Sequence, residues 1–353
     1  MVFIYKSILL AYWAFITILA LMPAPQSENL FPFSDKILHF ISFLVLLFLF
    51  DKSFKKQISP FSILFFPITL FIELLIFFRH LLTKNYHFSI PVICVGNIYL
   101  GGTGKTPLCI EIFSILKNLN MNPAFIRKKY DSFQDEANLE KQVGPIYQNI
   151  KRMEAIKEAI QNKVNIAILD DGFQDFSINK NLSIICFNEK QWIGNGMLIP
   201  SGPLRENLSA LKRADCVFIN GKKNVDTENE IYSKNKEIRI FYTEHKSQNI
   251  SEFKNKKVIA FAGIGNPINF FNLLKENNID VIEEKEFPDH YNYSEKELKN
   301  LISSAKEKNA ILLTTEKDYF RINKNYKKNI NLLKIVVEIQ NKDQFIREIK
   351  KII

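Results

Sequence analysis

The sequence predicts an α/β protein built from a phosphate-loop domain and a second, smaller α/β domain, preceded by N-terminal membrane helices. Apolar, strand-like runs occur at 92–95 and within 165–175, 261–271 and 310–322. The first run leads through a glycine-rich loop into a helical pattern, and the third leads through a glycine turn into another. Three apolar segments lie before the glycine-rich loop.

Composition and charge narrow the classes of function. The chain has 353 residues, enough for roughly two or three domains. Its net charge of +10 suits an anionic membrane surface or a phosphorylated substrate. Nucleic acid is not an expected partner, because no recognition motif or aromatic-basic interleaving occurs. The cysteines are scattered without a CxxC pair, so we expect buried thiols in a reducing compartment and neither disulfides nor metal ligands. They are Cys94, Cys109, Cys186 and Cys216.

Residues 1–50 hold two apolar segments, 7–22 and 37–50, which we expect to form a membrane anchor. A span needs roughly 20 residues, and the first segment reaches that length if it starts at Val2 and Lys6 snorkels. No small-residue cleavage site precedes Pro23, which favours an uncleaved anchor over a signal peptide.

Lysines set the expected orientation in the membrane. Lys52, Lys55 and Lys56 follow the second segment, so the positive-inside rule places this loop in the cytoplasm. The third apolar segment, 58–78, then begins and ends on the cytoplasmic side. We therefore expect a kinked interfacial helix within 51–84, with a buried helix of a soluble protein as the alternative.

The stretch VICVGNIYLGGTGKTPLCI, residues 92–110, predicts an NTPase-like phosphate loop. Glycines let backbone N–H groups surround phosphate oxygens, and the N-terminus of the following helix adds partial positive charge. We expect Lys105 to reach the outer phosphates and Thr106 to ligate Mg²⁺. The strict motif requires glycine at position 99, which is Tyr99, so a glycine turn with a chance lysine is the alternative. The candidate nucleotide-binding residues are Gly101, Gly102, Thr103, Gly104, Lys105 and Thr106.

The stretch NIAILDDGFQD, residues 165–175, predicts a second strand that ends in paired carboxylates. In phosphate-loop enzymes an aspartate at a strand end holds Mg²⁺, which makes Asp170 and Asp171 candidate metal ligands. Adjacent residues of a strand face opposite ways, so only one should point at the metal unless the chain turns at Gly172. An ordinary acidic turn is the alternative.

A loop at 192–207, WIGNGMLIPSGPLREN, contributes Arg205. An arginine can clamp a phosphoryl group or stabilise transition-state charge; the alternative is a solvated side chain. The second α/β unit carries Asp289 beside His290 in an aromatic loop, and a strand that closes with Lys317 and Asp318. The Asn-Lys-x-Asp pattern that reads guanine is absent, which favours ATP.

These motifs, in this order, resemble the tetraacyldisaccharide 4'-kinase family, the lipid A 4'-kinases of Gram-negative bacteria. The stretches are VGNIYLGGTGKTP, LDDGFQ, GNGMLIPSGPLRE, FAGIGNP, FPDHYNY and TTEKD, and the resemblance covers about residues 51–353. It implies a kinase that uses Mg²⁺ and ATP to phosphorylate the 4'-hydroxyl of an acylated disaccharide 1-phosphate lipid. It also implies two α/β domains, 85–222 and 223–353, with the site between them, at the cytoplasmic face of the bacterial inner membrane among its lipids.

The resemblance implies roles for individual residues. On the nucleotide side, Lys105 and Thr106 match the ATP loop, Asp170 and Asp171 the acidic pair, Gln174 the glutamine after it, and Arg205 the loop arginine. On the acceptor side, His290 matches a histidine that works with an aspartate on the acceptor hydroxyl. Asp135 supplies that aspartate. Arg152 matches an arginine lining the same cleft, and the resemblance implies that Arg152 and Gln174 bind the cofactor.

Two regions depart from the family pattern. After the first helix the family has Ser-Arg-Gly-Tyr-Gly and a longer glycine-rich segment, where this chain reads IRKKYDSFQDEA and keeps only Tyr130. The stretch DKILHFISF, residues 35–43, instead resembles VanZ-like small membrane proteins. Besides the kinase, two hypotheses therefore stay open: a membrane-associated phosphate-loop ATPase switch, and a non-catalytic derivative of the kinase.

Overall fold

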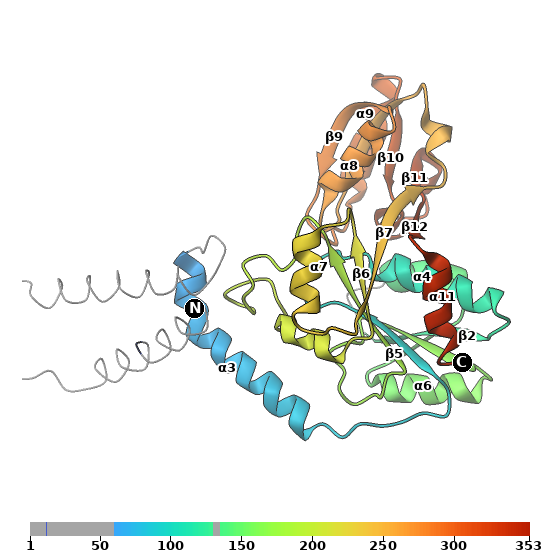
Figure 1. Cartoon of the computed structure of the whole chain (residues 1–353). Helices are drawn as coiled ribbons and strands as arrows, with labels where there is room; N and C mark the ends of the chain where they lie inside the picture. Colours follow the sequence, from blue (N-terminus) through green and yellow to red (C-terminus); the bar gives the residue numbers. More distant parts are fainter. Residues whose placement is uncertain (1–11, 13–59, 130–134) are drawn as a thin grey trace, which may run out of the picture. The chain divides into compact units, whose positions relative to one another are not determined.

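The computed structural model describes Tyr12 and residues 60–129 and 135–353, in two compact units (Figure 1). The predicted anchor at 1–50, apart from Tyr12, lies outside the described residues, as does the loop whose lysines set the expected orientation. Residues 60–82 and 193–208 form unit 1, and residues 83–192 and 209–353 form unit 2.

Unit 1 pairs one apolar helix with the 193–208 loop. The helix is α3 (Pro60–Leu82), with Pro67 inside it. The Thr69 hydroxyl donates a hydrogen bond to Ser201 Oγ (2.8 Å), Asn195 donates to Ser62 Oγ (3.3 Å), and Asn207 donates to Glu73. Much of the helix nevertheless exposes large apolar side chains, and by length and composition 62–82 could cross a membrane. The exposed side chains are Leu64, Ile68, Phe71, Leu74, Leu75, Phe77, Phe78, Leu81 and Leu82.

Unit 2 contains an eight-stranded sheet with the order β12-β7-β6-β5-β1-β4-β2-β3. Its neighbouring strands run parallel except β12, which pairs antiparallel with β7. The strands are β1 (Val92–Gly96), β2 (Pro123–Lys128), β3 (Ile146–Asn149), β4 (Ile166–Asp170), β5 (Leu182–Asn188), β6 (Cys216–Asn220), β7 (Arg239–Ser247) and β12 (Ile335–Ile339). The accompanying helices are α4 (Lys105–Asn118), α5 (Asp135–Val143), α6 (Arg152–Gln161), α7 (Val225–Tyr232) and α11 (Lys342–Lys350). Every residue of β1, β4 and β5 is buried, as expected for central strands of a parallel sheet.

A second, four-stranded parallel sheet in unit 2 has the order β11-β10-β8-β9. Its strands are β8 (Lys257–Ala262), β9 (Asp280–Glu286), β10 (Ile311–Thr315) and β11 (Ile330–Leu333), and its helices are α8 (Pro267–Glu276), α9 (Glu295–Glu307) and α10 (Glu316–Arg321). Short 3₁₀ turns occur at Leu208–Arg213, Ile250–Phe253 and Lys327–Asn329. Alternate residues of β8 enter different cores: Val258 and Ala260 pack with α8, whereas Ile259 and Phe261 pack with α9.

The chain passes between the two sheets twice. β7, β12 and α11 all come from the range 223–353 that the sequence assigned to the second domain, yet both strands join the eight-stranded sheet. The edge of this sheet therefore does not coincide with the expected boundary at residue 222. Hydrophobic periodicity identifies a strand but does not say which sheet it joins. No local sequence pattern therefore predicts that β12 joins the eight-stranded sheet.

Candidate active site

The glycine-rich loop connects β1 to α4 at the middle of the eight-stranded sheet, with β5 and β4 on either side of β1. Gly104 has a left-handed backbone (φ 85°) and lies directly before Lys105, the first residue of α4. A methyl group placed on Gly96 would lie 2.4 Å from Phe173 Cβ, so only glycine fits there. Inside the loop, Asn97 donates to Thr103 Oγ1 (3.1 Å). The loop is thus a closed turn at a helix N-terminus, which suits a phosphate group.

The two predicted carboxylates reach the loop through different partners. Val95 of β1 is in register with Asp170, the last residue of β4, which places Asp170 opposite the start of the loop. The Thr106 hydroxyl donates to Asp170 Oδ2 (2.9 Å). The chain then turns at Asp171, whose φ of 53° is left-handed, and Asp171 Oδ1 lies 3.7 Å from Lys105 Nζ. The turn begins one residue before Gly172, so both carboxylates stay at the loop.

The carboxylate of Asp170 fits a magnesium ion. Its Oδ1 atom is buried and accepts a hydrogen bond from none of the residues that the structure describes. A buried carboxylate oxygen without a partner is costly, and hard cations such as Mg²⁺ prefer oxygen ligands. Asp170 and the adjacent Thr106 hydroxyl are therefore the residues best placed to hold the ion, whereas Asp171 faces the Lys105 ammonium.

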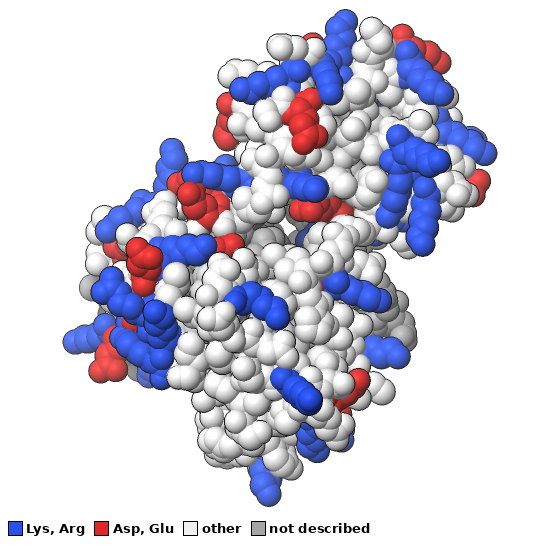
Figure 2. Space-filling model, turned by 90° about the vertical axis from the view of Figure 1, so that its right-hand side faces the viewer, with Lys and Arg blue, Asp and Glu red and all other residues white. Residues whose placement is uncertain are grey.

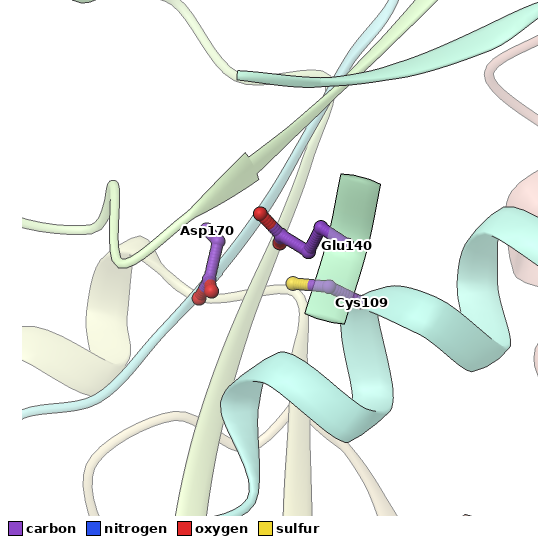
Figure 3. Close-up of side chains that lie close together, drawn as sticks. All are labelled: Cys109, Glu140 and Asp170. Carbon is purple, nitrogen blue, oxygen red and sulfur yellow. The ribbon is translucent and has the colours of Figure 1, made fainter. Parts of the chain in front are cut away.

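Asp170 belongs to a buried group of polar side chains, shown in Figure 3. Cys109, Glu140 and Asp170 place their polar atoms within 4.8 Å of one another. Arg127 NH1 donates to both carboxylates, at 2.8 Å to Asp170 Oδ2 and 3.2 Å to Glu140 Oε2. Burial raises the pKa of the Cys109 thiol well above its usual value, so this thiol stays protonated and is a poor metal ligand. Arg127, Asp170 and Glu140 thus form a buried ion-pair network that orients Asp170, and Cys109 beside it is buried, as the sequence predicted for this thiol.

Arg152 and Gln174 support the turn that follows the acidic pair. Arg152 begins α6, is buried, and donates to the Asp171 carbonyl (2.7 Å) and to Asp175 Oδ2 (3.4 Å). Burial alone would raise the pKa of Asp175, but hydrogen bonds from Ser177 and the charge of Arg152 outweigh it and lower that pKa. Gln174 donates to the Asn97 carbonyl (2.8 Å) and so joins the acidic turn to the phosphate loop.

Two residues that the sequence did not single out lie against the loop. His245 Nε2 would be 3.3 Å from a methyl group on Gly104, and it lies 3.3 Å from Asn220 Nδ2. Asn220 ends β6 and His245 is on the adjacent β7. Burial lowers the pKa of His245, so the imidazole is neutral at neutral pH and can accept the amide hydrogen bond. No motif marks either residue, because the order of the strands alone brings them to the loop.

His290 belongs to the second sheet and has a left-handed backbone (φ 58°). Its N–H donates to the Gly263 carbonyl (3.1 Å) and to Asp289 Oδ1 (3.0 Å). A methyl group on Gly265 would lie 3.1 Å from Asp289 Oδ2 and 4.0 Å from the Gly102 nitrogen. Gly265 in the turn at 263–266 thus lies close to both Asp289 of the His290 loop and Gly102 of the phosphate loop.

Of two further predicted residues, the structure describes the side chain of Arg205 but not that of Asp135. Asp135 is the first residue of α5, but its side chain lies outside the described part of the chain. Arg205 is half-buried in unit 1, next to the bridge between Leu198 and Leu204, and not in the unit that holds the phosphate loop.

Comparison with known proteins identifies the family. A family model described as tetraacyldisaccharide-1-P 4'-kinase (LpxK) matches residues 55–353. Tetraacyldisaccharide 4'-kinase of Pelagibacter ubique is 41% identical over 267 residues, which cover 75% of this chain and 85% of that protein. The enzyme of Rickettsia bellii is 36% identical over 294 residues, covering 78% and 89%.

A solved structure shares the fold. LpxK from Aquifex aeolicus in complex with ATP superimposes with a TM-score of 0.65 at 25% identity, over 82% of this chain and 99% of that one. The comparisons confirm the predicted resemblance, the α/β fold class and the kinase activity, and ATP, the predicted nucleotide, is the one that the A. aeolicus structure holds. The chain belongs to the tetraacyldisaccharide-1-P 4'-kinase family.

Proposed function

We propose that this chain transfers the γ-phosphoryl group of ATP to the 4'-hydroxyl of an acylated disaccharide 1-phosphate lipid, at the cytoplasmic face of the bacterial inner membrane. One observation carries the proposal: consecutive residues at the start of α4, Lys105 and Thr106, each contact one carboxylate of the acidic pair. A phosphate loop whose lysine and threonine are held in this way is prepared for a nucleoside triphosphate with its metal.

The residues divide into two groups by role. Backbone N–H groups of 101–104 and the start of α4 receive the phosphates, Lys105 neutralises charge on the transferring group, and Asp171 holds the lysine near that position. Thr106 and Asp170 hold Mg²⁺, which supplies further positive charge when bound. On the acceptor side Asp135 removes the proton of the sugar hydroxyl, and His290 orients or polarises that aspartate. Arg205, on the nucleotide side, steadies the charge of the transferring phosphoryl group.

Helix α3 anchors the enzyme to the membrane. Exposure of its large apolar side chains to water is unfavourable, and their burial in the lipid would stabilise the helix at the membrane. Figure 2 shows one face of the molecule on which Lys and Arg predominate over Asp and Glu, and the chain has a net charge of +10. Such a charge is attracted to an anionic leaflet, where the acylated substrate resides. Inner-membrane lipids are therefore proposed partners, and nucleic acid is not.

The test is transfer of label from ATP to lipid. Purified protein is incubated with γ-labelled ATP, Mg²⁺ and acylated disaccharide 1-phosphate in detergent micelles, and the lipid is extracted and counted. We expect labelled lipid from the wild-type protein and almost none from Lys105→Ala. Release of labelled phosphate without labelled lipid would favour the ATPase switch, and ATP binding without either product would favour the non-catalytic derivative.

A further inference from the structure

Both backbone polar groups of Gly263, the residue after β8, are hydrogen-bonded. Its N–H donates to Asp318 Oδ1 (3.0 Å). Its carbonyl accepts from the His290 N–H (3.1 Å) and from Arg321 NH1 (2.7 Å). The backbone of His290 is therefore connected to the carboxylate of Asp318 through a single glycine.

Asp318 is fully buried, and its carboxylate is extensively hydrogen-bonded. Oδ1 accepts from Gly263 and from the Tyr293 hydroxyl (2.8 Å), and Oδ2 accepts from Thr315 Oγ1 (2.6 Å). Arg321 NH1 lies 3.3 Å from Oδ1 and balances the charge. A buried ion pair is seldom the most stable choice for a site of this size, since apolar residues of similar volume serve stability as well. The pair of Asp318 and Arg321 instead contacts Gly263, which holds the backbone of His290, and this contact indicates a functional reason for the buried charges.

Tyr293 provides a second attachment on the other side of His290. It lies three residues further along the same loop, and its ring packs edge-on against Phe261 (5.5 Å) and Phe287 (5.0 Å). Burial and the neighbouring Asp318 charge raise the pKa of Tyr293, so its hydroxyl stays a hydrogen-bond donor. The left-handed backbone of His290 is thus held between two attachments, Gly263 and Tyr293, and both end at Asp318.

We propose that Asp318, Tyr293 and Arg321 form a positioning network that fixes His290 for its role on the acceptor side of the kinase reaction. The inference rests on the proposed function, because the role of His290 is part of it. None of the three is a catalytic residue: they act through the backbone of Gly263 and of the 287–293 loop. Their effect should fall on kcat for lipid phosphorylation, and ATP affinity should change little.

The test compares two tyrosines of the same loop. Tyr293→Phe removes the hydroxyl that contacts Asp318 and keeps the ring. Tyr291→Phe is the matched control, since its hydroxyl donates instead to Glu297 Oε1 (2.6 Å). We expect Tyr293→Phe to lower kcat about tenfold, the size expected for one hydrogen bond to a charged group. Tyr291→Phe should stay within about twofold of wild type, because Glu297 is only half-buried whereas Asp318 is fully buried.

A double variant separates positioning from general damage. In the His290→Ala background, Tyr293→Phe should cause no further loss of kcat, because the network acts through His290. An equal loss in both backgrounds would show a merely structural role and overturn the proposal. So would full activity of His290→Ala with the lipid acceptor.

Hydrogen exchange of backbone amides gives a readout that needs no activity. The Gly263 and His290 amides should exchange about tenfold faster in Tyr293→Phe, and at the wild-type rate in Tyr291→Phe. Unchanged exchange in Tyr293→Phe would overturn the network whatever the enzyme does. Altered exchange in a protein that labels no lipid would leave the network standing and remove the proposed function.

Discussion

The two sheets of unit 2 support their candidate residues in different ways. At the eight-stranded sheet, side chains contact side chains: Lys105 meets Asp171, and Thr106 meets Asp170. At the four-stranded sheet, His290 is held by its backbone, through Gly263 and a buried aspartate. Direct contacts between motif residues can be anticipated from a sequence, whereas a backbone attachment through a distant residue cannot. Loss of a side chain should therefore act immediately at the first sheet and indirectly at the second.

The largest expected effect tests the buried network behind the phosphate loop. Arg127→Met leaves two buried carboxylates, Asp170 and Glu140, side by side without their shared cation. We expect a loss of about 3–5 kcal/mol in the free energy of unfolding, measured by denaturant titration. The control is Lys157→Met, which breaks an exposed pair with Glu154 and should cost at most about 1 kcal/mol. Equal losses in the free energy of unfolding for the two variants would show that the buried network contributes no more to stability than the exposed pair.

The next effect concerns the lysine of the loop. Lys105→Ala should lower kcat at least about 100-fold, because a positive charge directed at the transferring group is lost. The variant should unfold at nearly the wild-type denaturant concentration, since Lys105 and Asp171 are both partly exposed and lie outside the hydrophobic core of the sheet. Activity close to wild type would show that Lys105 of the phosphate loop takes no part in the mechanism. It would also contradict the expectation that loss of a side chain acts directly at the eight-stranded sheet.

On the acceptor side we expect a similar loss of kcat, but one that is shared between two residues. Asp135→Ala and His290→Ala should each lower kcat about 100-fold, and the double variant should be little worse than the poorer single one. ATP affinity, measured by calorimetry, should be almost unchanged in all three. Independent, multiplicative losses would separate the two residues. An unimpaired Asp135→Ala would move the base elsewhere, with Asp131 the first residue to substitute.

The smallest effect is a pH dependence at His245. Burial lowers the pKa of His245 in the folded protein. Just below the pKa that His245 has in the unfolded chain, the unfolded chain therefore binds a proton at this residue and the folded protein does not. Stability should therefore fall as pH drops below about 6.5. His245→Asn should lose part of this fall, which unfolding titrations of both proteins at about pH 7.5 and about pH 5.5 would detect. Parallel behaviour of the two proteins would show that His245 is not the group responsible.

Those parts of the site that depend on neighbouring residues could be predicted from the sequence. Glycine spacing before Gly-Lys-Thr and paired aspartates after an apolar run are patterns that arise from contacts of neighbouring residues. They predicted the phosphate loop and the acidic pair, and together with the other motifs they indicated the family that the comparisons confirm. The anchor at 1–50 and the side chain of Asp135 remain predictions, because they lie outside the described residues.

The partners that are distant along the chain could not be predicted from the sequence and were found in the folded structure. Strand order brought Asn220 and His245 to Gly104, and it returned β12 to the first sheet after the second was complete. Asp318 of α10 contacts Gly263 after β8, although the two residues are 55 positions apart along the chain. Such contacts depend on which strands become neighbours, and that outcome depends on burial across the whole chain and not on any local pattern of residues.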